Sequence, residues 1–230
     1  MLKRTVLVGF LILTSFAWAG QSKDEVKDRL DNATKVLREI MNAPDKGIPE
    51  EVLDGAKCVA VVPHMIKGGL VFGAQHGRGI ATCRLTKGRW SAPAFFALTG
   101  GSWGAQIGAE GVDLVMLVMN EKGMNQLLSS KFQIGADASA AAGPVGRHAS
   151  AGTDWKLDTQ VLTYSRAKGA FAGITLNGSK IAQDEDSTVA FYGKALPLRA
   201  TLTGKVRTPA SARPFIAAVS RAKVMGENKT

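Results

Sequence analysis

The apolar residues of this chain change their spacing near residue 58. Between residues 23 and 41 they recur every three or four positions and form one stripe, which predicts an amphipathic helix. The stripe consists of Val26, Leu30, Ala33, Leu37 and Ile40. The segment Asn42-Ala43-Pro44 predicts the end of this helix, and Pro49 predicts the start of a short second one.

After residue 58 the apolar residues come in runs of about five to eight, separated by glycine-rich or basic segments, as in a series of strands. The predicted strands are CVAVVP (58–63), GGLVFGAQ (68–75), GIATCRL (79–85), WSAPAFFALT (90–99) and DLVMLVM (113–119). The segment QHGRG (75–79) is predicted to be a hairpin turn. DLVMLVM is apolar on both faces, so it is predicted to lie at the centre of the fold.

The rest of the chain adds further helices and strands. A helix is predicted over Glu121–Ser129, and the small residues of 136–143 suit closely packed strands. Asp184-Glu185-Asp186 predicts an acidic helix start, with a calcium ligand set as the alternative. A closing helix is predicted over 210–225. The predicted fold class is α+β: a large curved antiparallel β-sheet, open or partly closed as a barrel, with N-terminal and C-terminal helices.

The first 19 residues have the pattern of a signal peptide. Lys3 and Arg4 precede an apolar run, and Ala17-Trp18-Ala19 is a small-x-small cleavage motif. We expect cleavage near Ala19-Gly20 and a periplasmic or secreted protein. The predicted organisation is therefore a signal peptide (1–19), a single domain (20–222) and a flexible tail (223–230).

The two cysteines, Cys58 and Cys83, predict a disulfide in an oxidising compartment. Two buried thiols are the first alternative. Zinc is the second, because His64 and His76 lie between the cysteines, but their spacing matches no common zinc pattern. No metal or other cofactor is predicted.

Two segments carry the excess of basic residues. Residues 55–109 contain six basic side chains and no acidic one, and residues 194–230 contain eight against Glu227 alone. Such segments attract phosphates, and an exported protein meets anionic lipid more readily than nucleic acid, for which the chain has no motif. Solvated strand faces are the alternative interpretation.

Ser102 lies in Gly100-Gly101-Ser102-Trp103-Gly104, which fits the G-x-S-x-G elbow of a serine hydrolase. That elbow needs a helix after the serine, and the glycine-rich AQIGAEG that follows is a poor helix. Its triad would need His148, with Asp113 or Asp137 as the acid. A strand connection is therefore the preferred interpretation.

The aromatic residues of the central region admit two roles. Core packing is preferred, and the alternatives are the lining of an acyl pocket or contact with a membrane interface. They are Trp90, Phe95, Phe96, Trp103 and Trp155.

Four blocks of the chain together resemble the SYLF domain family, and they extend over about Asp24 to Arg221. The blocks are AKCVAVVPHMIKGGLVFGAQHGRGIATCR, WSAPAFFALTGGSWGAQIGAEGVDLVMLVMN, KFQIGADASAAAGPVGRHASAGTD and VLTYSRAKGAFAGITLNGSKIAQDEDSTVAFYG. The resemblance implies lipid binding, with phosphoinositides as the ligand in eukaryotic members, actin-filament binding in yeast members, and no catalytic activity.

We therefore expect a non-enzymatic domain of the bacterial envelope that binds anionic phospholipid headgroups. The candidate headgroup contacts are Lys67, Arg78, Arg84, Lys87, Arg89, Lys205 and Arg207. A structural or protein-partner-binding module of the envelope is the first alternative, and a serine hydrolase using Ser102 is the second.

Overall fold

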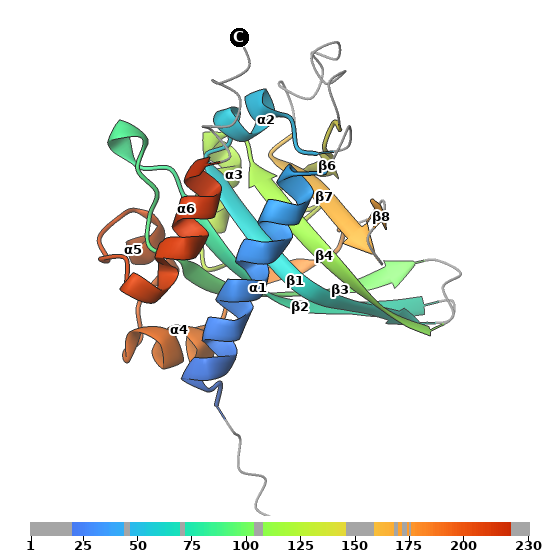
Figure 1. Ribbon diagram of the computed structural model, residues 1–230. Helices are drawn as coiled ribbons and strands as arrows, with labels where there is room; N and C mark the ends of the chain where they lie inside the picture. Colours follow the sequence, from blue (N-terminus) through green and yellow to red (C-terminus); the bar gives the residue numbers. More distant parts are fainter. Residues whose placement is uncertain are drawn as a thin grey trace, which may run out of the picture.

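A computed structural model describes residues 20–43, 47–69, 72–103, 108–145, 159–167, 170–171, 174 and 176–221. These residues form one β-sheet with helices packed on it (Figure 1). The strands are β1 (Cys58–Gly69), β2 (Phe72–Cys83), β3 (Ala94–Trp103), β4 (Gly108–Val118), β5 (Lys131–Gln133), β6 (Ala140–Ala142), β7 (Val161–Ala167), β8 (Ala170–Phe171) and β9 (Lys180–Gln183). The helices are α1 (Lys23–Met41), α2 (Glu50–Gly55), α3 (Glu121–Leu127), α4 (Glu185–Tyr192), α5 (Leu198–Leu202) and α6 (Arg213–Arg221), with single 3₁₀ turns η1 (Thr86–Gly88) and η4 (Ala210–Ala212).

The strand order is β5-β9-β3-β2-β1-β4-β7-β6, with β8 attached to β7. All neighbours are antiparallel except β6 and β7. Within the described residues the outermost strands, β5 and β6, do not pair with each other, so the curved sheet stays open. The predicted α+β class with a curved, largely antiparallel sheet and helices near both ends is confirmed.

Both faces of the central strands are buried. On β4, Val115 and Leu117 join the cluster under the helices, whereas Leu114 and Met116 join a second cluster on the opposite face. The first cluster is covered by α1, α2, α4 and α6, and the second by α3, α5 and the short strands. The sequence prediction that DLVMLVM lies at the centre is confirmed.

Helix α1 has the bounds that its apolar stripe predicts. It begins after Ser22, whose hydroxyl accepts a hydrogen bond from the Glu25 amide while the Glu25 carboxylate accepts one from the Ser22 amide. Its stripe packs on β1 and β2, with α4 and α6 as its helical neighbours. At its C-terminal end, Glu39 forms an ion pair with Arg166 of β7 at 3.1 Å.

The predicted hairpin turn at QHGRG is wrong, because these residues lie inside the long strand β2. The glycines of this segment allow side chains of neighbouring strands to pack directly against the backbone of β2. A Cβ at Gly77 would lie 2.5 Å from Val62 Cγ1, and a Cβ at Gly79 would lie 2.3 Å from Phe96 Cζ. The strand therefore needs residues without side chains at these two positions.

The later elements agree with the sequence in part. Asp184 is the N-cap of α4 and accepts a hydrogen bond from the Ser187 amide at 3.0 Å, which confirms the acidic helix start. Helix α3 begins at the predicted residue, and η4 with α6 occupies the predicted closing helix as far as Arg221. Helix α5 was not predicted. The proposed signal peptide and the tail lie outside the described residues.

Candidate binding surfaces

The predicted disulfide between Cys58 and Cys83 is present. The two residues face each other across β1 and β2, and both are buried. The zinc alternative for these cysteines is therefore wrong, since both sulfurs are bonded to each other. In the part of the chain that the structure describes, no cluster of three or more His, Cys, Asp or Glu side chains is placed to hold a metal ion.

Ser102 does not sit on a nucleophile elbow. Its backbone pairs with Gly73 inside β3, and only residues 104–107 separate β3 from β4. The elbow requires a strand, a sharp turn at the serine and then a helix, and this order of elements differs. Asp113 instead accepts a hydrogen bond from the His64 amide. His148 lies outside the described residues.

The central aromatic residues that the structure describes belong to the core. Trp90, Phe95 and Phe96 are buried, which confirms core packing for them. Phe95 packs edge-on against Phe191, with ring centroids 5.1 Å apart. The side chains of Trp103 and Trp155 lie outside the described part. No described helix is long and apolar enough to cross a membrane.

The seven basic residues predicted to contact lipid headgroups lie in three separate parts of the structure. Arg84 is used inside the fold: its guanidinium lies 4.6 Å from the centroid of the Trp90 ring and donates to the carbonyls of Leu53 and Ala56. Lys67 lies on the other half of β1, and Arg78 lies near the middle of β2. Lys67 pairs with a residue of β2 eight positions from Cys83, which is roughly 26 Å along the strand.

The remaining four basic residues lie on two neighbouring turns, and we call them together the basic face: Lys87, Arg89, Lys205 and Arg207. They lie on two turns, η1 with its flanking residues and the segment after α5. The turns meet where Gly204 lies against Leu85, since a Cβ at Gly204 would be 2.7 Å from Leu85 Cδ1. All four side chains are exposed, and among the described residues none forms an ion pair with a carboxylate.

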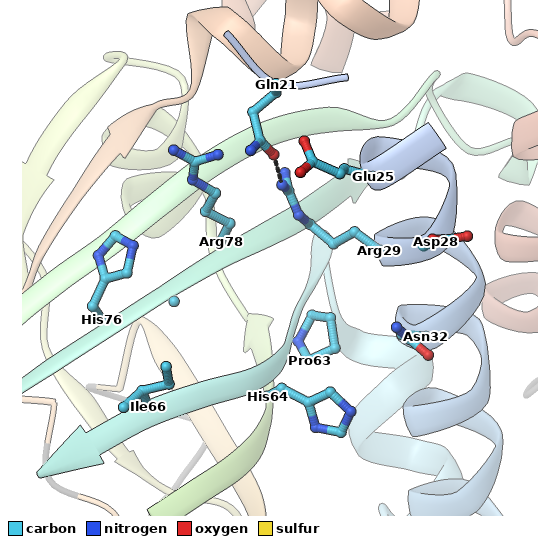
Figure 2. A pocket seen from close by; sticks show the side chains of 11 residues that line it. Gln21, Glu25, Asp28, Arg29, Asn32, Pro63, His64, Ile66, His76 and Arg78 are labelled. Carbon is cyan, nitrogen blue, oxygen red and sulfur yellow. Dashed lines mark hydrogen bonds between the residues drawn. The ribbon is translucent and has the colours of Figure 1, made fainter. Parts of the chain in front are cut away.

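A second surface feature lies between the N-terminal half of α1 and strands β1 and β2. It is a hollow of about 410 Å³, which we call the helix–strand hollow (Figure 2). Its wall on α1 includes Glu25, Asp28 and Arg29, and its wall on β2 includes His76 and Arg78. The strand β1 contributes Pro63, His64 and Ile66.

A buried carboxylate behind the hollow holds its two arginines. Asp184 Oδ2 lies 3.5 Å from Arg29 Nη1 and 3.6 Å from Arg78 Nε. Arg29 also donates to Ser187 Oγ at 2.8 Å and to the side chain of Gln21. Burial lowers the pKa of Arg29, and the neighbouring Asp184 opposes that shift. Arg29 therefore links α1 to the N-terminal end of α4.

The bulge in β1 presents His64 at the edge of the hollow. The register with both neighbouring strands shifts around Pro63 and His64, and His64 adopts a positive φ of 50°. Asp113 on β4 holds it there, accepting from its amide at 2.9 Å and lying 3.4 Å from its Nδ1. Pro63, at the end of the predicted strand 58–63, was the sequence signal for this bulge. Sequence reasoning missed the roles of Arg29 and Asp184, which no local pattern links.

The curved sheet, its helical cover and these two charged surface features define an α+β binding domain. A family model described as Ysc84, Las17-binding protein actin regulator, matches residues 99–222. The chain is 32% identical to Protein YSC84 of Saccharomyces cerevisiae over 199 residues, which cover 83% of this chain and 42% of that protein. It is 33% identical to the SH3 domain-containing YSC84-like protein 1 of Rattus norvegicus over 193 residues, 81% of this chain and 56% of that protein.

The chain therefore belongs to the Ysc84 (SYLF) family, and the resemblance seen in its sequence is confirmed. A further relative, LAS seventeen-binding protein 3 of Saccharomyces cerevisiae, is 30% identical over 83% of this chain and 43% of its own length. The chain spans about half the length of these relatives. The description of the family and the name LAS seventeen-binding protein 3 refer to binding and regulation rather than to an enzyme.

Proposed function

We propose that this domain binds the surface of membranes that contain anionic phospholipids, and that the basic face makes the contact. The observation that carries the proposal is the meeting of two basic turns, 85–89 and 203–207, at the contact of Leu85 with Gly204. Residues 55–109 contain no carboxylate, and residues 194–230 contain only Glu227. A cluster of unpaired cations attracts headgroup phosphates.

The expected strength follows from the number of charges. Each Lys or Arg held near an anionic membrane contributes about 1 kcal/mol, so the four together contribute about 4 kcal/mol when all approach the surface. This corresponds to roughly a 10³-fold change in the partition constant. Salt screens the interaction, because the Debye length falls to about 8 Å at physiological ionic strength.

Vesicle co-sedimentation with charge-matched variants tests the proposal. Replacing the four residues of the basic face by glutamine should reduce binding to vesicles rich in phosphatidylglycerol by roughly 10²- to 10³-fold at low salt. The matched control replaces four exposed lysines on other elements: Lys23, Lys122, Lys131 and Lys180. Equal losses in both variants, or no binding by the unmodified protein at low salt, would reject the proposal.

A second candidate function is docking of an acidic protein on the same basic face. The description of the family as a Las17-binding protein actin regulator favours it. A photo-reactive residue placed at position 87 or 205 would distinguish the two candidates in cells. Lipid adducts support the membrane proposal, whereas a single dominant protein adduct supports the docking proposal.

We also propose that the protein acts outside the cytoplasm. The pattern of residues 1–19 supports export, and the buried Cys58–Cys83 disulfide is a bond typical of oxidising compartments. Intact-mass measurement of the protein from fractionated cells should find it in the envelope or medium, beginning near Gly20. A full-length chain in the cytosolic fraction would overturn this proposal.

A further inference from the structure

The helix–strand hollow has unused hydrogen-bond donors on its β2 wall. Arg78 contacts Asp184 through Nε, and no hydrogen bond from its two terminal nitrogens is found among the described residues. His76 stands two residues before it on the same strand face and is exposed. In Figure 2 both side chains lie on the side of the hollow opposite α1.

Gln21 completes this set of donors. Its side-chain oxygen accepts from Arg29, and this bond orients the amide so that its NH₂ group points toward Arg78 (Figure 2). A forked guanidinium, an amide and an imidazole together match the oxygens of a tetrahedral oxyanion. The hollow of about 410 Å³ is large enough to admit such a group.

The charges around the hollow decide when an anion can enter. Arg29 and Arg78 are balanced by Asp184 and Glu25, and Asp28 and the His64–Asp113 pair lie at the margin. Among the described side chains that line the hollow, an additional positive charge therefore comes only from His64 and His76. Histidine side chains change charge between about pH 5 and pH 8.

We infer that the helix–strand hollow binds a phosphate or phosphomonoester group between Arg78, His76 and Gln21, and binds it more tightly when His76 is protonated. This site is separate from the basic face and does not depend on the function proposed for that face. Ile66, which is 59% exposed, borders the hollow and supplies an apolar contact for a ligand that carries a hydrocarbon portion.

Sulfate is the first probe, because its charge stays constant across the pH range while that of phosphate does not. Calorimetric titration should show sulfate binding roughly tenfold tighter at about pH 5.5 than at about pH 8. His76→Gln should remove this pH dependence. His64→Gln is the matched control, and it should keep most of the dependence because His64 is directed to Asp113.

Three results would overturn the inference. They are the absence of sulfate binding at both pH values, a pH dependence that survives His76→Gln, and equal effects of His64→Gln and His76→Gln. His76 is exposed, so its substitution should leave the thermal unfolding midpoint unchanged, and this measurement accompanies each titration.

Two further experiments distinguish a free phosphate ion from the phosphate of a lipid headgroup. Inorganic phosphate tests a free ligand, and vesicles of zwitterionic phosphatidylcholine that contain phosphatidic acid test a lipid headgroup. The vesicle arm uses the four-residue glutamine variant of the basic face, so that failure of the proposed function does not affect the result. If the lipid is the source, Ile66→Ser should weaken vesicle binding several-fold and leave sulfate binding unchanged. If the free ion is the source, phosphate binds and the vesicles do not.

Discussion

Gly79 is the position where one added methyl group should do most harm. It lies opposite Phe96 across β2 and β3, and a Cβ there would lie 2.3 Å from Phe96 Cζ and 2.8 Å from both Cε atoms. Phe96 is fully buried, so its ring has no open space to move into. Gly79→Ala should therefore force a shift of the ring or of the strand.

Inserting a methylene group into a well-packed core costs about 1 to 3 kcal/mol, and we expect the upper end because three ring atoms are contacted. For a domain of this size each kcal/mol lowers the unfolding midpoint by about 2 to 4 °C, so the expected fall is about 6 to 12 °C. The assay is thermal unfolding followed by circular dichroism, with a urea titration to give the free energy of unfolding.

Gly111→Ala is the matched control. Gly111 lies in β4, and a Cβ added there would meet nothing within 4 Å. Alanine at this position should leave stability unchanged or raise it by about 0.4 to 1 kcal/mol, because the unfolded chain loses conformational freedom. A Gly79→Ala protein as stable as the Gly111→Ala protein would refute the packing explanation for the glycines of β2. Recovery of stability on adding Phe96→Leu to Gly79→Ala would support it.

Three further predictions concern buried groups. Replacing Cys58 and Cys83 together by alanine should lower the free energy of unfolding by about 3 kcal/mol in a urea titration, because the bond closes a loop with a sequence separation of 25; an unchanged midpoint would contradict this. Asp184→Asn should cost about 3 to 5 kcal/mol by the same measurement, since it leaves two arginines without their buried carboxylate, and a loss below 1 kcal/mol would show that the ion pairs are not needed. Burial raises the pKa of Tyr164 and Tyr192 above the ordinary value of about 10. The two neutral tyrosines therefore make their full contribution to the free energy of unfolding below about pH 10, and this contribution is lost as the pH rises through their pKa in the folded protein. Absorbance at about 295 nm should show tyrosinate only as the protein unfolds, and ionisation of either tyrosine in the native state near pH 10 would contradict the prediction.

Local sequence patterns were sufficient to predict the helices and strands whose signals lie within one segment. The stripe and capping residues of α1, the two-sided apolar run of β4 and the acidic start of α4 are all properties of neighbouring residues. The predicted turn at 75–79 failed because glycine serves both turns and close packing. Only the position of Phe96 on another strand shows that packing is the reason at Gly79.

The surfaces depend on contacts between distant segments, which explains why the sequence predicted them only in part. The excess of basic residues was visible, but the meeting of Leu85 with Gly204 joins turns more than 100 residues apart. In the same way, Asp184 forms ion pairs with Arg29 and Arg78, which lie on two elements that precede it by more than 100 residues. No periodicity in either segment indicates such a partner.

The neighbourhood of α1 and α6 has a consequence for how the chain folds during synthesis. The first and last helices of the described chain lie side by side, and Phe215 of α6 belongs to the same buried cluster as Leu30 and Leu37 of α1. The hairpins of β1 to β4 come from one continuous stretch and can form early, but the apolar stripe of α1 stays partly uncovered until residues 213–221 arrive. A chain that emerges N-terminus first, from the ribosome or across a membrane, therefore completes its core only when α6 has emerged.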